Sequence, residues 1–432
     1  FLGFDPTLII SSNQSEITIK SGKGEVKKLN KDIFLKLKEI MEKFNPVKVS
    51  GLPRFYGGLV GFFSYEIINQ IENISRKDHV RADFPDSLFM LTDSVIIFDN
   101  INKTAKIVIN VHIKDKKTYK TSYKKALDQI NKIEALLKST KKNPYREIAR
   151  FSKETHPIIS NFTKPDFLNA VKKIKKYVRA GDVIQTVVSQ RWETKYQDDP
   201  INLYRALRKN NPSPYMFYIK MDKSLIVGAS PEVLVRLENN RVESRPIAGT
   251  RPRGLNEESD LKMEKELLSD PKELAEHVML VDLARNDISR VCKNGSVQVS
   301  EMMNIERYSH VMHIVSHVEG VMKANKDCFD LLKSTFPAGT LSGAPKIRAM
   351  QIINELEPNP RGPYGGSVGY FGFSGNMDMS IVIRSFYIKG DKLYFQAGAG
   401  IVADSVPNSE FEETKSKSKA MLDAIKKSLV EE

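Results

Sequence analysis

Residues 164–192 read KPDFLNAVKKIKKYVRAGDVIQTVVSQRW, a helical pattern followed directly by a strand pattern. Apolar residues recur at the i, i+4, i+7 and i+11 spacing of one helix face: Phe167, Val171, Ile174 and Val178. Gly181 stands where a helix C-cap is expected, and the β-branched run 183–188 then predicts a strand. This stretch therefore indicates a fold that mixes helices with buried strands.

Strand patterns predominate outward from this stretch. Residues 95–113 predict a hairpin, because an apolar run and an alternating run flank an Asp-Asn turn. A lysine-rich helix within 112–142 follows, then a polar connection around 141–144. On the C-terminal side we predict helices at 271–291, 345–356 and 409–430, and strands at 217–220, 225–228, 233–237, 241–244, 381–388 and 393–397.

Strands in hairpin-like succession with helices between them favour an α+β fold over a parallel doubly wound one. The polar connection suggests a boundary near 145–155. We therefore expect an N-terminal region, 1–145, and a second region, 150–432.

The composition is that of a soluble globular protein, with 41% hydrophobic and 28% charged residues in 432. No apolar run approaches the ~18 residues that cross a bilayer. Cys292 and Cys328 lack metal-type spacing, which indicates a reducing, cytoplasmic setting. The first residue is Phe1 rather than Met, so we expect the true beginning of the protein to be missing.

The net charge of +14 raises the question of nucleic-acid binding. The lysines are densest in 112–142, where they alternate with apolar residues as on a solvated helix face. Aromatic platforms that single-strand binders need are not evident. A basic binding protein without enzymatic activity stays an alternative, and a basic surface also suits anionic substrates.

Two pairs of acidic residues stand three apart on predicted helices: Glu273 with Glu276, and Glu410 with Glu413. The i, i+3 spacing places both acids of a pair on one helix face. In the first helix, a separate apolar stripe is expected to face the core: Leu274, Val278, Val281 and Ile288. Acids in a first helical turn also suit the helix dipole. Two pairs on two helices suit Mg²⁺, which takes one or two protein carboxylates plus an anionic substrate.

Four segments are rich in glycine and mostly apolar: PIAGTRPRG (246–254), FPAGTLSGAPK (336–346), RGPYGGSVGYFG (361–372) and QAGAGIV (396–402). Glycine lets backbone approach a ligand closely, although ordinary turns explain any one of them. Arg384 interrupts the strand-like run IVIRSFYI, where it either faces solvent or holds a carboxylate. His313 has no serine or cysteine partner pattern, so covalent acyl chemistry is not indicated.

Taken in order, these motifs resemble the chorismate-utilising enzymes, and most closely the large components of anthranilate synthases. The resemblance covers essentially the whole chain and rests on PIAGTRPRG, ELAEHVMLVDLARND, YSHVMHIVS, FPAGTLSGAPKIRAM, YGGSVGYFG, IVIRS, QAGAGIVADSVP and SEFEET, with FYGGLVGFFSYE, GDVIQTVVSQR, NPSPYMFYIK and GASPEVLVRL before them. It implies a large α+β assembly whose core is two antiparallel sheets with surrounding helices. Region 1–145 would be the N-terminal regulatory and partner-contacting part, and 150–432 the catalytic domain.

The resemblance also implies an activity: Mg²⁺-dependent amination of chorismate by ammonia, then elimination of pyruvate to give anthranilate. It assigns catalytic roles to Glu232 as the acid for the departing 4-hydroxyl, and to His313 and Thr340 beside the ring. It implies metal ligation by Glu276 and Glu413, with Glu273 and Glu410 around them. It implies substrate contacts by Gly249, Thr250, Tyr364, Arg384, Gly398, Ala399 and Gly400.

Two positions favour anthranilate as the product. Related enzymes that hydrate chorismate carry a lysine base where Gln185 stands, and an amide cannot serve as that base. Aminodeoxychorismate synthases, the alternative within the family, commonly carry a nucleophilic lysine where Ala248 stands. Free ammonia is therefore the expected nucleophile.

No glutamine-hydrolysing module is found, so a glutamine amidotransferase subunit is the implied partner in a hetero-oligomer. Pro214, Tyr215 and Met216 match half of the family's tryptophan feedback site. The other half, a serine-bearing strand, normally precedes the FLGFDP with which this sequence opens. Feedback inhibition of the full protein stays a hypothesis.

Overall fold

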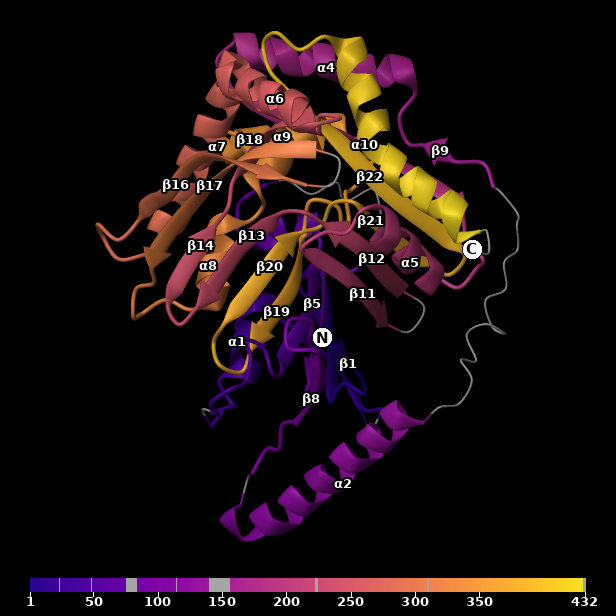
Figure 1. The fold of residues 1–432 in the computed structure, drawn as a ribbon, viewed down its shortest axis with the longest axis vertical. Helices are drawn as coiled ribbons and strands as arrows, with labels where there is room; N and C mark the ends of the chain where they lie inside the picture. The colour runs from indigo at the N-terminus through magenta and orange to yellow at the C-terminus, as the bar shows by residue number, and fades with distance from the viewer. Residues whose placement is uncertain are drawn as a thin grey trace.

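The computed structural model describes residues 1–22, 24–47, 49–74, 84–113, 115–139, 156–221, 224–308 and 311–429. Two large sheets form its centre, and every strand pair in them is antiparallel (Figure 1). This confirms the predicted α+β class with a two-sheet core. Within the described residues, no helix combines the length and the apolar character that a membrane span requires.

The larger sheet joins strands from both ends of the chain. Its order is β15 (Ile247–Pro252), β17 (Val311–Val321), β14 (Arg241–Ser244), β13 (Val233–Glu238), β20 (Met377–Ile381), β19 (Ser367–Gly372), β5 (Gly58–Phe63), β6 (Ser87–Thr92), β2 (Leu8–Asn13), β3 (Glu16–Ser21) and β4 (Val26–Asn30), with β16 (Gln298–Arg307) also on β17. N-terminal β5 and C-terminal β19 pair side by side along their whole length. Strands within residues 8–92 and strands within residues 233–381 thus share one sheet.

The smaller sheet has the order β11 (Tyr215–Met221), β12 (Ser224–Ser230), β21 (Ser385–Lys389), β22 (Lys392–Ile401), β10 (Gln185–Lys195) and β18 (Gly343–Ala344), with β9 (Ile159–Ser160) also on β10. A third, small sheet is made by β1 (Leu2–Gly3), β7 (Ser94–Asp99) and β8 (Thr104–Ile109). The β7–β8 pair confirms the hairpin predicted at 95–113.

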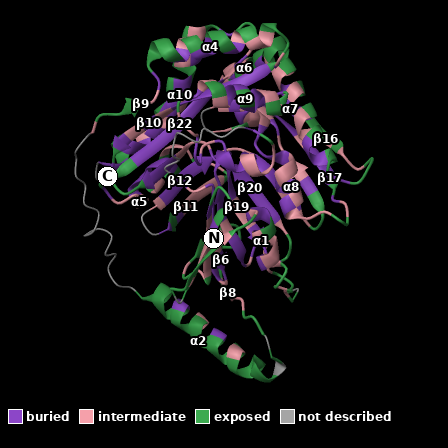
Figure 2. Cartoon of the chain, turned by 180° about the vertical axis from the view of Figure 1, so that it is seen from behind, coloured by how far each residue is buried: buried purple, intermediate pink, exposed green. Residues whose placement is uncertain are grey.

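Helices and short 3₁₀ turns cover these sheets: α1 (Ile33–Met41), η1 (Tyr65–Gln70), η2 (Lys116–Thr118), α2 (Tyr119–Lys138), α4 (Lys164–Arg179), α5 (Ile201–Asn210), α6 (Glu257–Ser269), α7 (Pro271–Ser289), α8 (Cys328–Thr335), η3 (Gly339–Leu341), α9 (Lys346–Leu356) and α10 (Pro407–Ser428). The opening stretch folds as predicted, as α4 followed by β10, with Gly181 at φ +81°. The lysine-rich helix is α2, which Figure 2 shows as largely exposed. The expected boundary at 145–155 lies outside the described residues.

The two large sheets pack face to face through one apolar layer. The larger sheet contributes Phe62, Leu88 and Val368, and the smaller sheet contributes Ile219, Ile226, Tyr387 and Tyr394. On β22, side chains alternate between faces, so Gln396, Gly398 and Gly400 share the inner face with Tyr394. The outer face of the smaller sheet is buried under α5 and α10. A site built on these glycines therefore continues the inter-sheet layer.

Two predictions at this level differ from the structure. The strand predicted at 381–388 is broken, because β20 ends at Ile381 and β21 begins at Ser385. On α7, Val281 and Ile288 of the predicted stripe are buried, but Val278 is exposed, and His277 and Leu280 lie on the buried face. The glycine-rich segment QAGAGIV lies mostly in β22, which contains the strand predicted at 393–397.

Candidate active site

Glu232 lies between β12 and β13, beside an open pocket that Thr340 also lines. The Thr340 Oγ1 hydroxyl donates a 3.0 Å hydrogen bond to Glu232 Oε1. Burial raises the pKa of Glu232 to about 7, against the opposing effects of this hydrogen bond and of the Arg384 and Lys417 charges. A carboxyl with this pKa is protonated in a large fraction of molecules near neutral pH, which suits a general acid.

Arg384 occupies the junction between β20 and β21, with a left-handed φ of +52°. A non-glycine residue holds such a backbone only where the surroundings fix it, which is frequent at functional sites. Burial lowers the pKa of Arg384, whereas Tyr364 and Glu232 raise it. The positive charge of Arg384 in turn acts on the pKa of His313. One guanidinium thus stands among the predicted acid, tyrosine and histidine.

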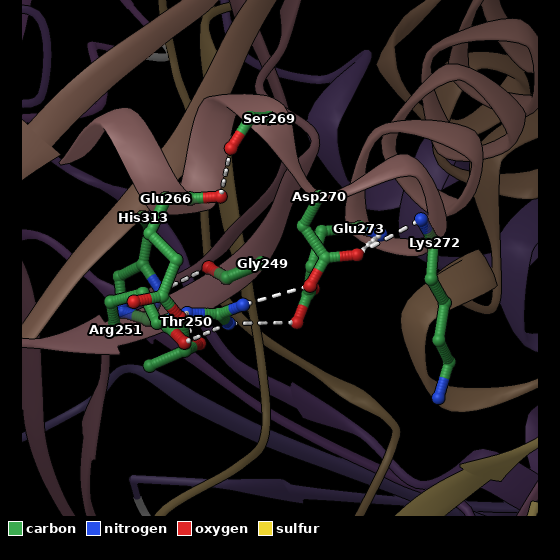
Figure 3. Close-up of polar contacts among 9 residues, drawn as sticks. All are labelled: Gly249, Thr250, Arg251, Glu266, Ser269, Asp270, Lys272, Glu273 and His313. Atoms are coloured by element: carbon green, nitrogen blue, oxygen red, sulfur yellow. Dashed lines mark hydrogen bonds and ion pairs between the residues drawn. The ribbon is translucent and has the colours of Figure 1, made fainter. Parts of the chain in front are cut away.

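His313, on β17, faces the neighbouring strand β15 (Figure 3). Its Nδ1 atom lies 3.0 Å from both the Gly249 carbonyl oxygen and the Thr250 hydroxyl. A carbonyl only accepts, so Nδ1 carries the proton and Nε2 is left as the basic atom. Burial lowers the pKa of His313, which keeps the ring neutral. The imidazole is therefore a base with a fixed tautomer.

The glycines of β22 make room for side chains that cross the sheet face. A Cβ added at Gly398 would lie 3.0 Å from the Tyr364 hydroxyl oxygen, and one at Gly400 would lie 2.3 Å from Gln185 Nε2. Ala399 is fully buried on the opposite face, so only its backbone can contact a ligand in the site. Burial raises the pKa of Tyr364 to about 12, which keeps its hydroxyl a hydrogen-bond donor.

Two of the predicted acids border the same end of β22. Glu276 Oε1 accepts a 3.0 Å hydrogen bond from Gln185 Nε2, the amide that faces Gly400. Glu413 pairs at 2.7 Å with Lys417, whose Nζ donates to the Gly398 carbonyl oxygen at 3.2 Å. Glu276 on α7 and Glu413 on α10 are thus both tied to the strand segment 398–400.

The other two acids have different surroundings. Glu273 accepts a 3.1 Å hydrogen bond from Arg251 Nη1, in a cluster that Figure 3 shows with Asp270. Glu410 is 7% exposed, and its Oε2 atom has no hydrogen-bond donor in the described structure. Burial and the nearby Glu413 raise the pKa of Glu410, whereas a hydrogen bond with Ser405 and the charge of Lys272 on α7 lower it.

The four glutamates do not form one cluster in the described structure, and their assignment as metal ligands stays a prediction. Within the described residues, no three His, Cys, Asp or Glu side chains lie close enough to hold a metal. Two cations partly explain why the glutamates do not gather. Arg251 forms ion pairs with both Glu273 and Asp270, and Lys417 forms one with Glu413. The donor chemistry still fits Mg²⁺, since two carboxylates from two helices border one segment and Glu410 offers an orphan oxygen.

The residues expected for feedback lie apart from this cluster. Pro214 precedes β11, and Tyr215 and Met216 begin it. The Tyr215 hydroxyl donates to Asp378 Oδ1 at 2.9 Å and accepts from Arg236 Nη2 at 2.9 Å. Tyr215 is therefore linked to β13 and β20, which lead to Glu232 and Arg384; its tryptophan role stays a prediction.

Sequence reasoning missed Lys417. Its charge acts on Glu232 and Glu410, and its ammonium contacts Glu413 and the Gly398 carbonyl. The signal was present, because Lys417 follows Glu413 by four residues on one helix and so shares its face. A lysine among many lysines on α10 carried no other mark.

The site combines an acid of raised pKa, two cations and two carboxylates around the glycines of β22. This combination is typical of an enzyme that acts on a small anionic substrate. The chain belongs to the chorismate binding enzyme family, whose model matches residues 3–423.

Individual relatives agree with this family. The chain is 46% identical over 427 residues to anthranilate synthase component 1 of Acetivibrio thermocellus, covering 98% of this chain and 86% of that protein. It is 50% identical over 395 residues to anthranilate synthase component 1 of Aquifex aeolicus, covering 91% and 79%. The crystal structure of anthranilate synthase component I from Streptococcus pneumoniae matches with a TM-score of 0.85 at 35% identity, covering 97% of this chain and 91% of that one.

Proposed function

We propose that this chain is the large subunit of an anthranilate synthase, which aminates chorismate with ammonia and eliminates pyruvate. The buried Gln185 amide, which donates to Glu276, carries this choice within the family. An amide cannot deprotonate water at neutral pH, so hydration of the ring is disfavoured. Ala248 is a buried methyl on β15 and offers no amine for a covalent adduct. The names of the relatives support the same reaction.

The residues of the site divide the chemistry among them. Arg384 and the Tyr364 hydroxyl would bind the enolpyruvyl carboxylate of the dianionic substrate. Ammonia would add at C2 while protonated Glu232 donates its proton to the 4-hydroxyl, which leaves as water. His313 Nε2 would then take the C2 proton as the C3–O bond breaks, so the ring becomes aromatic and enolpyruvate leaves. Enolpyruvate takes up one proton at its methylene carbon to become pyruvate.

Mg²⁺ would be held by Glu276 and Glu413, with Glu273 and Glu410 around them. When bound, it supplies positive charge to the ring carboxylate. Lys417, already at the Glu413 carboxylate, would add a second cation there. Ammonia is proposed to come from a separate glutamine amidotransferase subunit, since the relatives are named as a component 1.

Identification of the product tests this function. The purified chain is incubated with chorismate, Mg²⁺ and ammonium salt at alkaline pH, where neutral NH₃ is abundant, and the products are separated by mass spectrometry. Anthranilate and pyruvate in equal amounts support the proposal. Aminodeoxychorismate or isochorismate as the product would redirect it within the family, and unchanged chorismate would refute it.

A further inference from the structure

Arg361 is a buried guanidinium that lies outside the site residues named so far. Its side chain is 2% exposed and forms a bidentate pair with Glu357, through Nε to Oε2 at 2.9 Å and Nη2 to Oε1 at 2.7 Å. Nη1 donates to the Leu341 carbonyl oxygen at 2.6 Å, and Nη2 donates to the Val187 carbonyl oxygen at 2.9 Å. The guanidinium is therefore bound to two separate backbone segments as well as to its counterion.

Both segments carry residues of the proposed active site. Leu341 directly follows Thr340, which holds Glu232, and Val187 lies two residues after Gln185 on β10. The guanidinium carbon is also 5.7 Å from the ring centroid of Tyr364, within the range of a cation–π contact. The Arg361 side chain thus contacts the segments that carry Thr340 and Gln185, and it also contacts Tyr364.

Glu357 and Glu66 extend the connection. Glu357 Oε1 also accepts hydrogen bonds from Ser189 N at 2.8 Å and Ser189 Oγ at 2.7 Å. Gln396, two residues before Gly398, donates to Ser189 Oγ at 2.7 Å. The Glu66 carboxylate accepts from the backbone N–H groups of Arg361 at 2.6 Å and of Gly362 at 3.0 Å. The segment that leads to Tyr364 is thereby fixed to η1, which directly follows β5.

We propose that Arg361 is a positioning residue for the active site. It holds Tyr364, the Thr340–Glu232 pair and the Gln185 end of β10 in fixed positions relative to one another. This inference rests on the proposed function of those residues. Replacing a buried ion pair by neutral groups often leaves stability nearly unchanged, so such a pair is better explained by the arrangement that it specifies. In an active site, a misplacement of about 1 Å costs on the order of 100-fold in rate.

The decisive variant is the double replacement Glu357→Gln with Arg361→Met. It removes both charges together, so no buried charge is left unpaired. The matched control is Arg241→Met with Glu319→Gln, another ion pair between strands, which joins β14 to β17 and, among the residues that the structure describes, has no contact with the proposed machinery. We expect both variants to unfold cooperatively on heating. In the Arg361 variant, kcat/KM for chorismate should fall roughly 100-fold with a raised KM, whereas the control should stay close to the parent.

The pH profile of kcat/KM is a second measurement, which a loss of stability alone would not shift. If Leu341 is released, the Thr340 hydrogen bond that lowers the pKa of Glu232 weakens, and the alkaline limb of kcat/KM shifts to higher pH. A folded double variant with the rate constant and pH profile of the parent would overturn the proposal. Should the double variant not fold, Arg361→Lys keeps the charge; it must then show the same loss in part, and full activity would overturn the inference.

Failure of the function itself is recognised separately. If the parent chain makes no anthranilate, the proposed reaction is refuted by that control alone. Chorismate binding, measured by titration calorimetry, then decides the positioning role: weaker binding by the Arg361 variant than by the parent supports it, and equal binding overturns it.

Discussion

The pKa of Glu232 depends on the balance between burial of the carboxyl and its hydrogen bond with the Thr340 hydroxyl. Burial raises its pKa to about 7, and the Thr340 hydrogen bond opposes that rise. A general acid works in its protonated form, so kcat/KM at constant free NH₃ should be flat below about pH 7 and fall above it. Glu232→Gln should lower kcat by roughly 10²–10⁴-fold, since an amide donates no proton.

Thr340→Val should shift the same alkaline limb upward, because the carboxylate loses a donor. Thr335→Val is the matched control, as this buried hydroxyl bonds only within its own helix turn. An alkaline limb that stays in place in Thr340→Val, or moves down, would contradict the assigned role.

Gly400 is required for space rather than for backbone freedom. A Cβ there would meet Gln185 Nε2 at 2.3 Å, and this flexible amide would swing away from Glu276. We expect Gly400→Ala to fold normally but to lose on the order of 100-fold in kcat/KM for ammonia, the scale of a contact displaced by about 1 Å in an active site. The control is Gly22→Ala, where the nearest atom is 3.6 Å away. Normal ammonia kinetics in Gly400→Ala would argue against Gln185 as part of the site.

Glu413 offers the most direct test of the metal proposal. It is exposed on α10, so Glu413→Gln should fold while turnover is nearly abolished and Mg²⁺ binding, measured by calorimetry in the presence of chorismate, is strongly weakened. Glu412→Gln is the control, because this neighbouring acid faces Lys415 instead. Near-normal Mg²⁺ dependence in Glu413→Gln would remove that residue from the site.

Residue identities were more predictable than their geometry. The charge of Arg384 acts on the pKa of both Glu232 and His313, so these positions are neighbours in the fold, while their catalytic roles stay predictions. The left-handed backbone of Arg384 could not be anticipated, because strand propensity continues through IVIRSFYI while the site's surroundings override it. Arg361 left no periodic signal, because its partners are carbonyl groups far away in the chain.

At the scale of elements, α7 depends on a polar contact that its sequence conceals. His277, fully buried, faces Ser316 on β17 with Nε2 and Oγ 2.6 Å apart, and Ser316 Oγ also accepts from Met303 N at 2.9 Å. Apolar periodicity missed this face because it treats histidine as polar and hence exposed. The contact fixes the side of α7 that carries Glu273 and Glu276.

Ser316→Ala should therefore destabilise the protein by about 2–3 kcal/mol, since it leaves a buried ring nitrogen and a backbone N–H without a partner. Urea unfolding followed by circular dichroism measures this change. Ser380→Ala, at a buried serine on β20 that makes one 3.3 Å bond, should cost clearly less. Equal costs for the two variants would show that the His277 contact is not special.

At the scale of the whole molecule, the larger sheet contains strands from both of the expected regions, 1–145 and 150–432. Hairpin patterns predicted neighbouring strands well, because the chain turns locally. Hairpin patterns could not predict that β5 and β19 pair, because the residue pattern of a strand does not identify a pairing partner far away in the chain. The division itself stays a prediction.

Separate fragments test how the two parts depend on each other. Fragments 1–139 and 156–432, produced in the same cells, should copurify through the β5–β19 pair. Fragment 156–432 alone should aggregate, because the loss of β5 exposes an edge strand and its apolar face. Size-exclusion chromatography measures both outcomes. A monomeric, cooperatively unfolding 156–432 would contradict the expectation.

The β5–β19 pair also sets a schedule for biosynthesis. Phe63 meets Ser367, so roughly 300 residues must be translated between one strand and its neighbour. At roughly 5–20 residues per second, the first strands remain on the ribosome for tens of seconds with an open, hydrogen-bonding edge. Such distant contacts also slow the search for the native topology. Newly made chains of this protein should thus need chaperone protection at their N-terminal end until the ribosome has nearly finished.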